Sequence, residues 1–369
     1  MRIASFNVEN LFERAKALKS RSWQVSRPIL DAHASLNAAL QKPEYTPDTK
    51  RRVIALLDRL GLTQSDEGPY VRLRQNRGRL LRRPKGGGVE IVARGRGDWI
   101  GWVELTTEPV DDIAMDTIAR VITDVGPDIL GVVEAESRTA LKRFTDGSLR
   151  HGGEPVYPHV MLVDGNDDRG IDVGILTKPD LPLRDLRSHV DDVDDRGRVF
   201  SRDCPEYAVV TPSGERMLIL VNHLKSKGYG GQTQSNATRR RQAQRVADIY
   251  RERVAEGVKY VAVLGDFNDT PDSEPLSPLV AGTDLRDIST HPDFDDGGRP
   301  GTFGNGTARN KIDYVLLSPA LSERATGGAI WRKGVWGGKN GTLWPIYETM
   351  TAPVHAASDH AAVYADIAL

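Results

Sequence analysis

The chain has little of what marks exported or membrane-embedded proteins. Its 369 residues include a single cysteine, Cys204, so no internal disulfide can form. No stretch approaches the roughly 18 consecutive apolar residues of a membrane span. The opening RIASFNVENLF alternates like a strand and lacks the basic start, apolar run and cleavage site of a secretory leader. We therefore expect a cytoplasmic globular protein with no membrane partner.

The sequence also lacks an overall charge of either sign, because its formal net charge is only −1. The two signs are nevertheless unevenly distributed. Residues 16–110 carry 18 Lys and Arg against 10 Asp and Glu, whereas the remainder carries 32 against 41. The basic segment favours a polyanion as partner, and the acidic remainder favours a cation site.

Apolar patterning predicts strands that follow one another with few helices between them. Residues 111–128 carry apolar side chains at helical spacing and end at Gly126 and Pro127, which predicts an amphipathic helix, and 239–257 predicts a second. This order indicates an α+β fold with mixed or antiparallel sheets. The strands are expected at 2–8, 129–137, 171–178, 206–210, 216–224, 259–268, 311–319 and 361–369.

Polar side chains stand at the ends of these apolar runs, where they are costly unless they converge on partners. Carboxylates with carboxamides form an oxygen-rich site suited to Mg²⁺ or Mn²⁺, and a neighbouring histidine can accept a proton or stabilise charge. The strand-end set is Asn7, Glu134, His223, Asp266, Asn268, Asp313, Asp359 and His360.

Six motifs occur in one order: SFNVENLF, VVEAES, NHLKSK, GDFND, IDYVLLS and SDHAAV. Together they resemble the endonuclease/exonuclease/phosphatase superfamily, the deoxyribonuclease I-like fold. The resemblance implies a four-layer α/β/β/α sandwich of two packed sheets with helices outside and a metal site at one edge. It covers residues 1–15 and 111–369 as the catalytic domain, which leaves 16–110 as an inserted basic subdomain.

The resemblance also implies roles for the strand-end residues. Glu134 is the principal metal ligand, with Asn7 and Glu9 close by and Asp359 as a further metal or water ligand. Asp266 orients or deprotonates the attacking water, and Asn268 holds a phosphate oxygen. His360 contacts the phosphate with its ring fixed by Asp313, and His223 donates to the phosphate. The general base, Asp266 or His360, stays undecided.

Residues around this set have both functional and ordinary interpretations. Lys225 and Lys227 are candidates to grip phosphate, although lysines after a strand are usually solvated. In NDDRGIDVG, the segment Asp167, Asp168, Arg169 and Asp172 is a candidate rim loop near the substrate or a plain polar turn. We retain Lys225, Arg169 and Asp172 as substrate-binding candidates.

The sequence of the insertion predicts two helices, at 26–41 and 46–61, followed by a basic antiparallel ribbon. The second helix has Thr46 as cap, Pro47 in its first turn and Gly61 as stop. Nine Lys and Arg against one Glu lie between Arg72 and Arg96. Such a ribbon favours binding to a nucleic-acid backbone, with Arg79, Arg82 and Arg83 as candidates. Trp99 and Trp102 are expected to be core residues.

Three functions compete. A metal-dependent nuclease, acting on DNA by preference and on RNA as a second option, explains both the site and the insertion. A phosphatase or phosphodiesterase for inositol phosphates, phospholipid head groups or another small ester explains only the site, and one fold hosts all of these. An inactive interaction module is disfavoured because it has no need of the polar strand ends.

Overall fold

The computed structural model of the chain describes residues 1–9, 11, 13–18, 23–167, 169–227 and 231–369. The contacts divide the chain into two compact units. Unit 1 contains Met1–Phe12, Val110–Lys227 and Gly231–Leu369, and unit 2 contains Glu13–Pro109. Asp168, one of the rim-loop candidates, lies outside the described residues.

Unit 1 is built on two mixed sheets. The pairs β1/β8, β20/β22 and β17/β18 are parallel, and the other neighbours are antiparallel. The first sheet has the order β11 (His159–Val163), β12 (Asp172–Thr177), β8 (Ile129–Ala135), β1 (Arg2–Asn7), β23 (Ala362–Ile367), β22 (Ala325–Trp331) and β20 (Phe294–Asp295). The second has the order β13 (Leu183–Arg187), β16 (Glu206–Val210), β17 (Arg216–His223), β18 (Tyr260–Asp266), β21 (Asp313–Leu317) and β19 (Arg286–Asp287).

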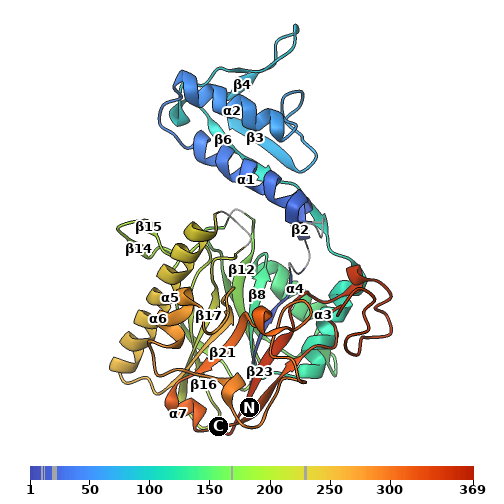
Figure 1. The fold of residues 1–369 in the computed structure, drawn as a ribbon, viewed down its shortest axis with the longest axis vertical. Coiled ribbons are helices and arrows are strands. Elements are labelled where there is room, and N and C mark those ends of the chain that lie inside the picture. Colours follow the sequence, from blue (N-terminus) through green and yellow to red (C-terminus); the bar gives the residue numbers. More distant parts are fainter. Residues whose placement is uncertain (10, 12, 19–22, 168, 228–230) are drawn as a thin grey trace. The chain divides into compact units, whose positions relative to one another are not determined.

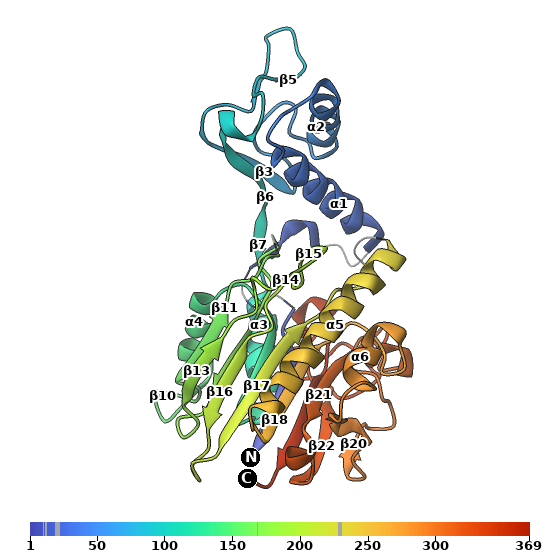
Figure 2. The same ribbon diagram turned by 90° about the vertical axis from the view of Figure 1, so that its left-hand side faces the viewer.

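The two sheets pack face to face over a shared core of aliphatic side chains, which includes Val133 from one sheet and Leu264 from the other. Helices α3 (Asp112–Val125) and α4 (Arg138–Ser148) cover the outer face of the first sheet. Helices α5 (Gln232–Ala255) and α6 (Ser277–Val280) cover the second, and Figures 1 and 2 show the two helix layers outside the sheets. The predicted four-layer α/β/β/α sandwich is confirmed.

Local signals set the helix boundaries in unit 1. In α3, the Asp111 side chain caps the first turn by accepting the Ile113 N–H at 2.9 Å, and Gly126 ends the helix at φ +61°. Helix α5 begins at Gln232, seven residues before the predicted start at 239. The added turns are polar, and the Gln232 Nε2 stabilises them by donating to Asn236 Oδ1 one turn later, at 2.9 Å.

Unit 2 has its own apolar core beneath two helices and a ribbon. In α2, Thr46 accepts the Thr49 N–H at 3.2 Å, and Gly61 follows at φ +74°, so the predicted cap and stop are confirmed. The predicted ribbon consists of the antiparallel pair β3/β6 with the short pair β4/β5 nested between its strands. The elements are β2 (Glu13–Ala15), α1 (Trp23–Leu40), α2 (Pro47–Arg59), β3 (Val71–Arg77), β4 (Leu81–Arg82), β5 (Glu90–Ile91), β6 (Ile100–Leu105) and β7 (Thr107–Pro109).

The two tryptophans of the ribbon have different environments. Trp99 is 1% exposed and donates its indole N–H to the Tyr45 hydroxyl at 2.9 Å, which confirms the expected core position. Trp102 is 41% exposed, so its expected burial is wrong. The reason is strand alternation, because Gly101 and Val103 of β6 take the inward positions and Trp102 points to the other side.

Short elements complete unit 1. No helix within the described residues is both long and apolar enough to span a bilayer. The remaining elements are β9 (Arg150–His151), β10 (Glu154–Pro155), β14 (Val193–Asp194), β15 (Gly197–Arg198) and α7 (Pro319–Ser322).

Candidate active site

The polar strand ends meet at one edge of the sandwich because of strand direction. Parallel pairing of β17 with β18 places His223 beside Asp266, and antiparallel pairing of β18 with β21 places Asp313 on the other side of Asp266. In the first sheet, β1 and β8 are parallel and Asn7 lies opposite Val133. The carboxyl ends of four strands and the amino ends of their antiparallel neighbours therefore share this edge.

Gly265 permits the close approach of β17 and β18 at this edge. Its φ is +133°, and a Cβ at this position would lie 1.9 Å from the Asn222 carbonyl oxygen. Only glycine fits such a position without moving the neighbouring backbone. The glycine of GDFN therefore sets the strand spacing that brings Asp266 next to His223.

Asp266 lies at the centre of the polar set and is 2% exposed. Its Oδ1 accepts the Asn268 N–H at 2.8 Å, and its Oδ2 accepts the Asn268 Nδ2 at 3.0 Å and the Asn7 Nδ2 at 3.4 Å. Burial and the charge of Asp313 raise the pKa of Asp266 to about 7, against the opposing effects of His360 and the Asn268 hydrogen bond. The carboxylate is thus poised to exchange a proton near neutral pH.

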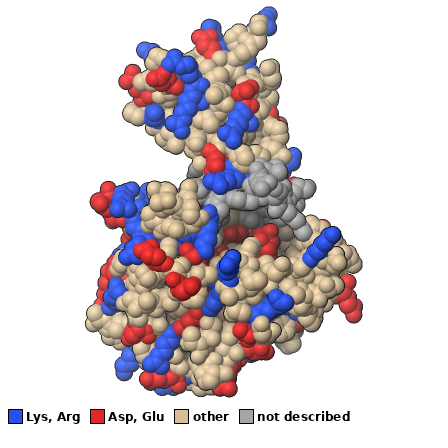
Figure 3. All heavy atoms as spheres, viewed as in Figure 1, with Lys and Arg blue, Asp and Glu red and all other residues tan. Residues whose placement is uncertain are grey.

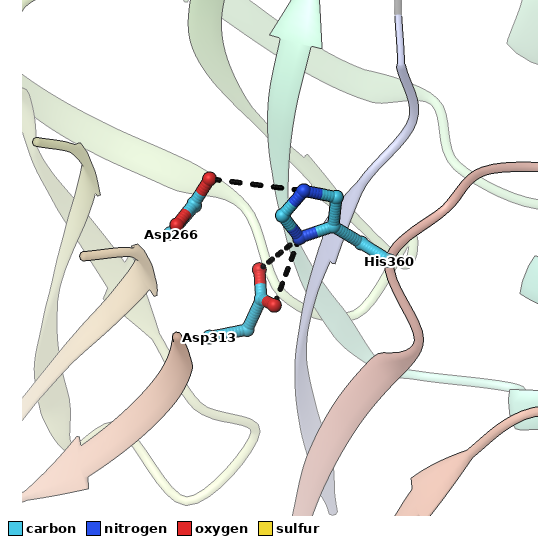
Figure 4. Close-up of side chains that lie close together, drawn as sticks. All are labelled: Asp266, Asp313 and His360. Carbon is cyan, nitrogen blue, oxygen red and sulfur yellow. Dashed lines mark hydrogen bonds and ion pairs between the residues drawn. The ribbon is translucent and has the colours of Figure 1, made fainter. Parts of the chain in front are cut away.

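His360 and Asp313 form a second, tightly bound pair (Figure 4). His360 Nδ1 lies 2.9 Å from Asp313 Oδ2, which also accepts the Thr302 hydroxyl at 2.6 Å. Burial alone would lower the pKa of His360, but the charge of Asp313 and its hydrogen bond raise that pKa well above 6.5. The protonated ring presents Nε2 toward Asp266 Oδ2, 4.0 Å away.

His223 has the opposite electrostatic environment. Burial, together with the positive charges of Arg202 and Arg169, lowers the pKa of His223 well below 6.5. Its Nε2 lies 3.6 Å from Asp266 Oδ2 and 3.7 Å from Glu134 Oε1. The site therefore holds one neutral and one protonated histidine at pH 7.

Glu134 is aimed by an irregularity in its strand. The register of β8 against β12 passes from Val133 to Ala135, so Glu134 is the extra residue of a β-bulge. Its φ is +67°, and the other non-glycine residues with positive φ in the described part of the chain are Glu9 at +50° and Asn268 at +56°. All three belong to the set selected from the sequence. Residues held in this unfavourable region cluster at functional sites.

Comparison with known proteins places the chain in a family. The model described as "Endonuclease/Exonuclease/phosphatase family" matches residues 108–360. The chain belongs to this family. Its members are metal-dependent phosphoester hydrolases, and so is this protein. A search of curated proteins finds no significant match.

Solved structures share the fold of this family member. A mannosyl-6-phosphatase from Bacteroides thetaiotaomicron is similar with a TM-score of 0.52 and 18% identity, over 69% of this chain and 90% of that one. An endonuclease/exonuclease/phosphatase family protein from the same organism has a TM-score of 0.51 and 18% identity, over 68% and 84%. One from Bacteroides vulgatus has a TM-score of 0.50 and 17% identity, over 70% and 90%.

The residues at the edge fit a divalent cation. No described residue donates a hydrogen bond to the Glu134 carboxylate, whose side chain is 19% exposed, and burial raises its pKa. The Asp359 N–H donates to Glu9 Oε2 at 3.2 Å, so the Glu9 carboxylate lies against the backbone of Asp359. Ligand atoms of Asp266, Asp313 and His360 also lie within 4.8 Å of one another. Such oxygen-rich sets suit hard cations.

The three substrate-binding candidates, Lys225, Arg169 and Asp172, make different contacts. Arg169 binds Asp167 through two hydrogen bonds of 2.8 and 2.6 Å. Asp172 is 5% exposed and accepts the Gly165 N–H at 2.7 Å, and burial raises its pKa to about 7. Burial and the charges of Arg202 and Arg169 lower the pKa of Lys225 to about 8. Lys227, by contrast, pairs with Asp269.

The sequence analysis missed Arg202, which is 2% exposed. Its Nε lies 3.2 Å from Asp167 Oδ2, and burial lowers its pKa while the charges of Asp167, Glu134 and Asp266 oppose this effect. Burying a charged side chain is costly unless opposite charges lie close to it. The signal available was weak, because an arginine between a turn and a strand is usually solvated.

The three insertion arginines are bound to different extents. Arg83 donates to the carbonyls of Leu62 and Thr63 and pairs with Asp66 at 2.8 Å, so it stabilises the turn after α2. Arg82 pairs with Glu90 at 2.6 Å, and Arg79 is exposed without a partner among the described residues. On the face of unit 2 that Figure 3 shows, acidic side chains lie among the basic ones, so the positive charge of this face is partly compensated locally.

Proposed function

We propose that the protein is a nuclease, a divalent-metal-dependent phosphodiesterase that hydrolyses DNA or RNA by in-line attack of an activated water. The observation that carries the proposal is the joint presence of the phosphoesterase edge and a basic insertion with 18 Lys and Arg against 10 Asp and Glu. A polyanionic substrate gives both features a role, because backbone phosphates supply both the scissile bond and the charge that the insertion attracts.

In this proposal, Glu134 holds Mg²⁺ or Mn²⁺ together with Asn7, Glu9 and Asp359. The bound cation supplies charge neutralisation on the phosphate oxygens. The bulge at Glu134 and the positive φ angles at Glu134 and Glu9 support these positions, since unfavourable backbone conformations are typical of functional sites.

Asp266 orients the attacking water and accepts its proton. Its two hydrogen bonds from Asn268 hold the carboxylate in place, and its pKa of about 7 matches proton transfer near neutral pH. Asn268 Nδ2 donates to Asp266 Oδ2 and to the Leu224 carbonyl at 3.2 Å. One of these hydrogen bonds must therefore break before Asn268 can donate to a phosphate oxygen.

His360, protonated and fixed by Asp313, stabilises through Nε2 the negative charge that the phosphate oxygens carry in the transition state. His223 is neutral and donates one N–H to a phosphate oxygen. Arg202 adds positive charge near the carboxylates of Glu134 and Asp266, and Lys225 adds positive charge near Arg202. Neither residue takes over a role assigned above.

The alternative is a phosphatase or phosphodiesterase for a small ester. It uses the same edge residues, and the likeness to a mannosyl-6-phosphatase concerns the fold alone. This alternative gives the insertion no role in substrate binding, which is why we place it second.

A substrate panel separates the two. The full chain is incubated with Mg²⁺ or Mn²⁺ and plasmid, single-stranded DNA, RNA or a set of phosphomonoesters, with Asp266→Asn as the matched variant. We expect cleavage of nucleic acid that stops in excess chelator and falls by roughly 100-fold or more in the variant, because the amide keeps the shape but loses the basic oxygen. Turnover of phosphomonoesters without nucleic acid cleavage would establish the alternative, and unchanged activity of Asp266→Asn would refute the mechanism.

A further inference from the structure

The β3/β6 ribbon of unit 2 has one buried and one open face. Leu73 and Val103 point inward to the core formed with α1 and α2. Ile100 and Trp102, two positions apart on β6, point to the other face and are 47% and 41% exposed. A tryptophan offers one of the largest apolar surfaces of any side chain, so its exposure next to a second apolar residue marks a binding surface.

Arginines line the neighbouring strand on the same face. Arg74 lies opposite Trp102, Arg72 lies opposite Glu104, and Arg77 lies opposite Ile100. Paired residues of adjacent strands share a face, so these arginines lie on the same face of the ribbon as Trp102. We define the outer face as Arg72, Arg74, Arg77, Ile100 and Trp102.

Glu104 shares the outer face with the arginines, and part of their positive charge stays available to an anion. Arg77 is exposed and has no partner among the described residues. Arg74 pairs with Glu104 at 2.7 Å and Arg72 pairs with Glu67 at 2.9 Å, with arginine side chains 42% and 39% exposed. Surface pairs of this kind contribute little stability, and each guanidinium has five N–H donors, so donors remain for a phosphate.

We propose that the outer face binds single-stranded nucleic acid, with an unpaired base stacked on Trp102 and the backbone phosphates held by Arg72, Arg74 and Arg77. Proteins that bind single strands combine basic side chains, which hold the backbone, with aromatic side chains on which bases stack. A duplex keeps its bases stacked inside and offers the indole no ring face, so it engages only the arginines. DNA and RNA strands present the same chemistry.

The proposal rests on the proposed nuclease function and deepens it, since it identifies the form of nucleic acid that the insertion recruits. It also supplies a role for unit 2 that does not depend on Arg82 and Arg83, whose ion pairs and hydrogen bonds commit them to unit 2 itself. The insertion begins shortly after Glu9 in the sequence, so a short connecting segment joins the proposed recruitment surface to a candidate metal ligand.

Binding is measured with the full chain in excess chelator, so that no hydrolysis occurs, by fluorescence anisotropy of labelled oligo(dT), oligo(U) and a hairpin duplex. We expect Trp102→Ala to weaken single-strand binding by roughly 5- to 100-fold and to leave duplex binding nearly unchanged. Trp102→Phe restores part of the affinity because it keeps a stacking ring. Quenching of tryptophan emission by oligo(dT) is expected in the wild type and reduced in Trp102→Phe.

The arginines have a separate signature. Arg77→Gln lowers the slope of log affinity against log salt by about 0.7 for a single strand, whereas Trp102→Ala leaves the slope unaltered. Arg51→Gln is the matched control, because it removes the same charge from helix α2 of the same unit, and Val193→Ala is the control for loss of an exposed apolar side chain in unit 1. Both controls are expected to bind as the wild type does.

Three outcomes overturn the proposal: unchanged single-strand affinity in Trp102→Ala, equal losses for single strand and duplex, or a change of oligomeric state upon Trp102→Ala with nucleic acid binding intact. The last would make the outer face an interface between copies of the chain. Single-strand binding through Trp102 without any nucleic acid cleavage in the substrate panel would refute the nuclease function and leave the binding proposal standing.

Discussion

The His360–Asp313 pair offers a sharp test of the candidate mechanism, by the substitution Asp313→Asn. Asp313 is 1% exposed, and its carboxylate accepts from His360 Nδ1 and from the Thr302 hydroxyl. Thr302 Oγ1 accepts the backbone N–H groups of Ile312 and Asp313 at 3.2 and 3.0 Å, and its own proton has a much shorter contact to Asp313 Oδ2, at 2.6 Å, than to the Asn310 carbonyl, at 3.3 Å. An asparagine that keeps its oxygen at the Oδ2 position still accepts from Thr302 and from His360 Nδ1, but it carries no charge and places its amide N–H groups where Oδ1 lies 3.1 Å from that ring nitrogen.

The substitution removes the negative charge of residue 313 and one of the two oxygens that lie within reach of His360 Nδ1. The charge and the hydrogen bond of Asp313 are what raise the pKa of His360, so that pKa falls in the variant and the ring becomes neutral at a lower pH. A hydrogen bond to a charged group contributes about 1.5 to 3 kcal/mol. If this contribution is lost from the transition state, the rate falls roughly 10- to 150-fold at neutral pH.

The assay is the pH profile of kcat/KM on a small artificial phosphodiester, with NMR titration of the histidine rings in parallel. A group with a raised pKa stays protonated until the pH passes that pKa, so wild-type activity that needs protonated His360 is lost on the alkaline side. In Asp313→Asn this alkaline limb moves to lower pH. The surface variant Asp185→Asn is the control and keeps the wild-type profile, because its carboxylate is exposed.

The reasoning is refuted if Asp313→Asn lowers the rate equally at every pH, with the alkaline limb in place and the His360 titration unmoved. A merely structural role for Asp313 predicts that result. Thermal unfolding of the variant separates it from a general loss of fold.

Two further predictions concern metal binding and stability. Glu134→Gln is expected to shift the Mn²⁺ midpoint of activity at least several-fold while preserving the thermal midpoint, because an amide is a poorer ligand of nearly equal shape; an unmoved Mn²⁺ midpoint would show that Glu134 is not a ligand. Glu206, 3% exposed, accepts from Arg253 Nε at 2.6 Å and His189 Nε2 at 2.8 Å; burial alone would raise its pKa, but these hydrogen bonds lower it below 4.5. The stabilisation of the folded state by the Glu206 carboxylate is therefore present above about pH 4.5 and is lost as the pH falls through the lowered pKa. Urea unfolding of Glu206→Gln should show a free energy of unfolding about 3 kcal/mol below that of the wild type at pH 7, and this difference should narrow toward pH 4. A difference that does not depend on pH would contradict the prediction.

Much of the fold and of the candidate site was predictable because its signals are local. Apolar runs that stop at a polar residue reveal both the strand and the place where it ends, as in VAVLGD before Asn268. Cap and stop residues act within one helical turn, so the boundaries of α2 followed from Thr46 and Gly61. The ordered motifs together carried the resemblance to the family, and that resemblance implied a metal site at one edge of the sandwich.

Other features depended on residues far apart in the chain. The bulge at Glu134 exists only because β12 pairs with β8 across a shifted register, and no property of VVEAES by itself announces it. The burial of Arg202 depends on its pairing with Asp167 from another loop. Burial and partnership are properties of the assembled layers, so these two residues acquired their electrostatic character only in the tertiary structure.

The same division separates the arginines and tryptophans of unit 2. The sequence by itself determined that this segment is basic and contains two tryptophans, since composition does not depend on folding. Only the tertiary structure decided that Arg83 donates hydrogen bonds to backbone carbonyls and pairs with Asp66, that Trp99 is buried, and that Trp102 faces outward. Side chains alternate along a strand, so which tryptophan meets the core is fixed by where the helices pack on the ribbon, and that is a property of contacts between distant segments.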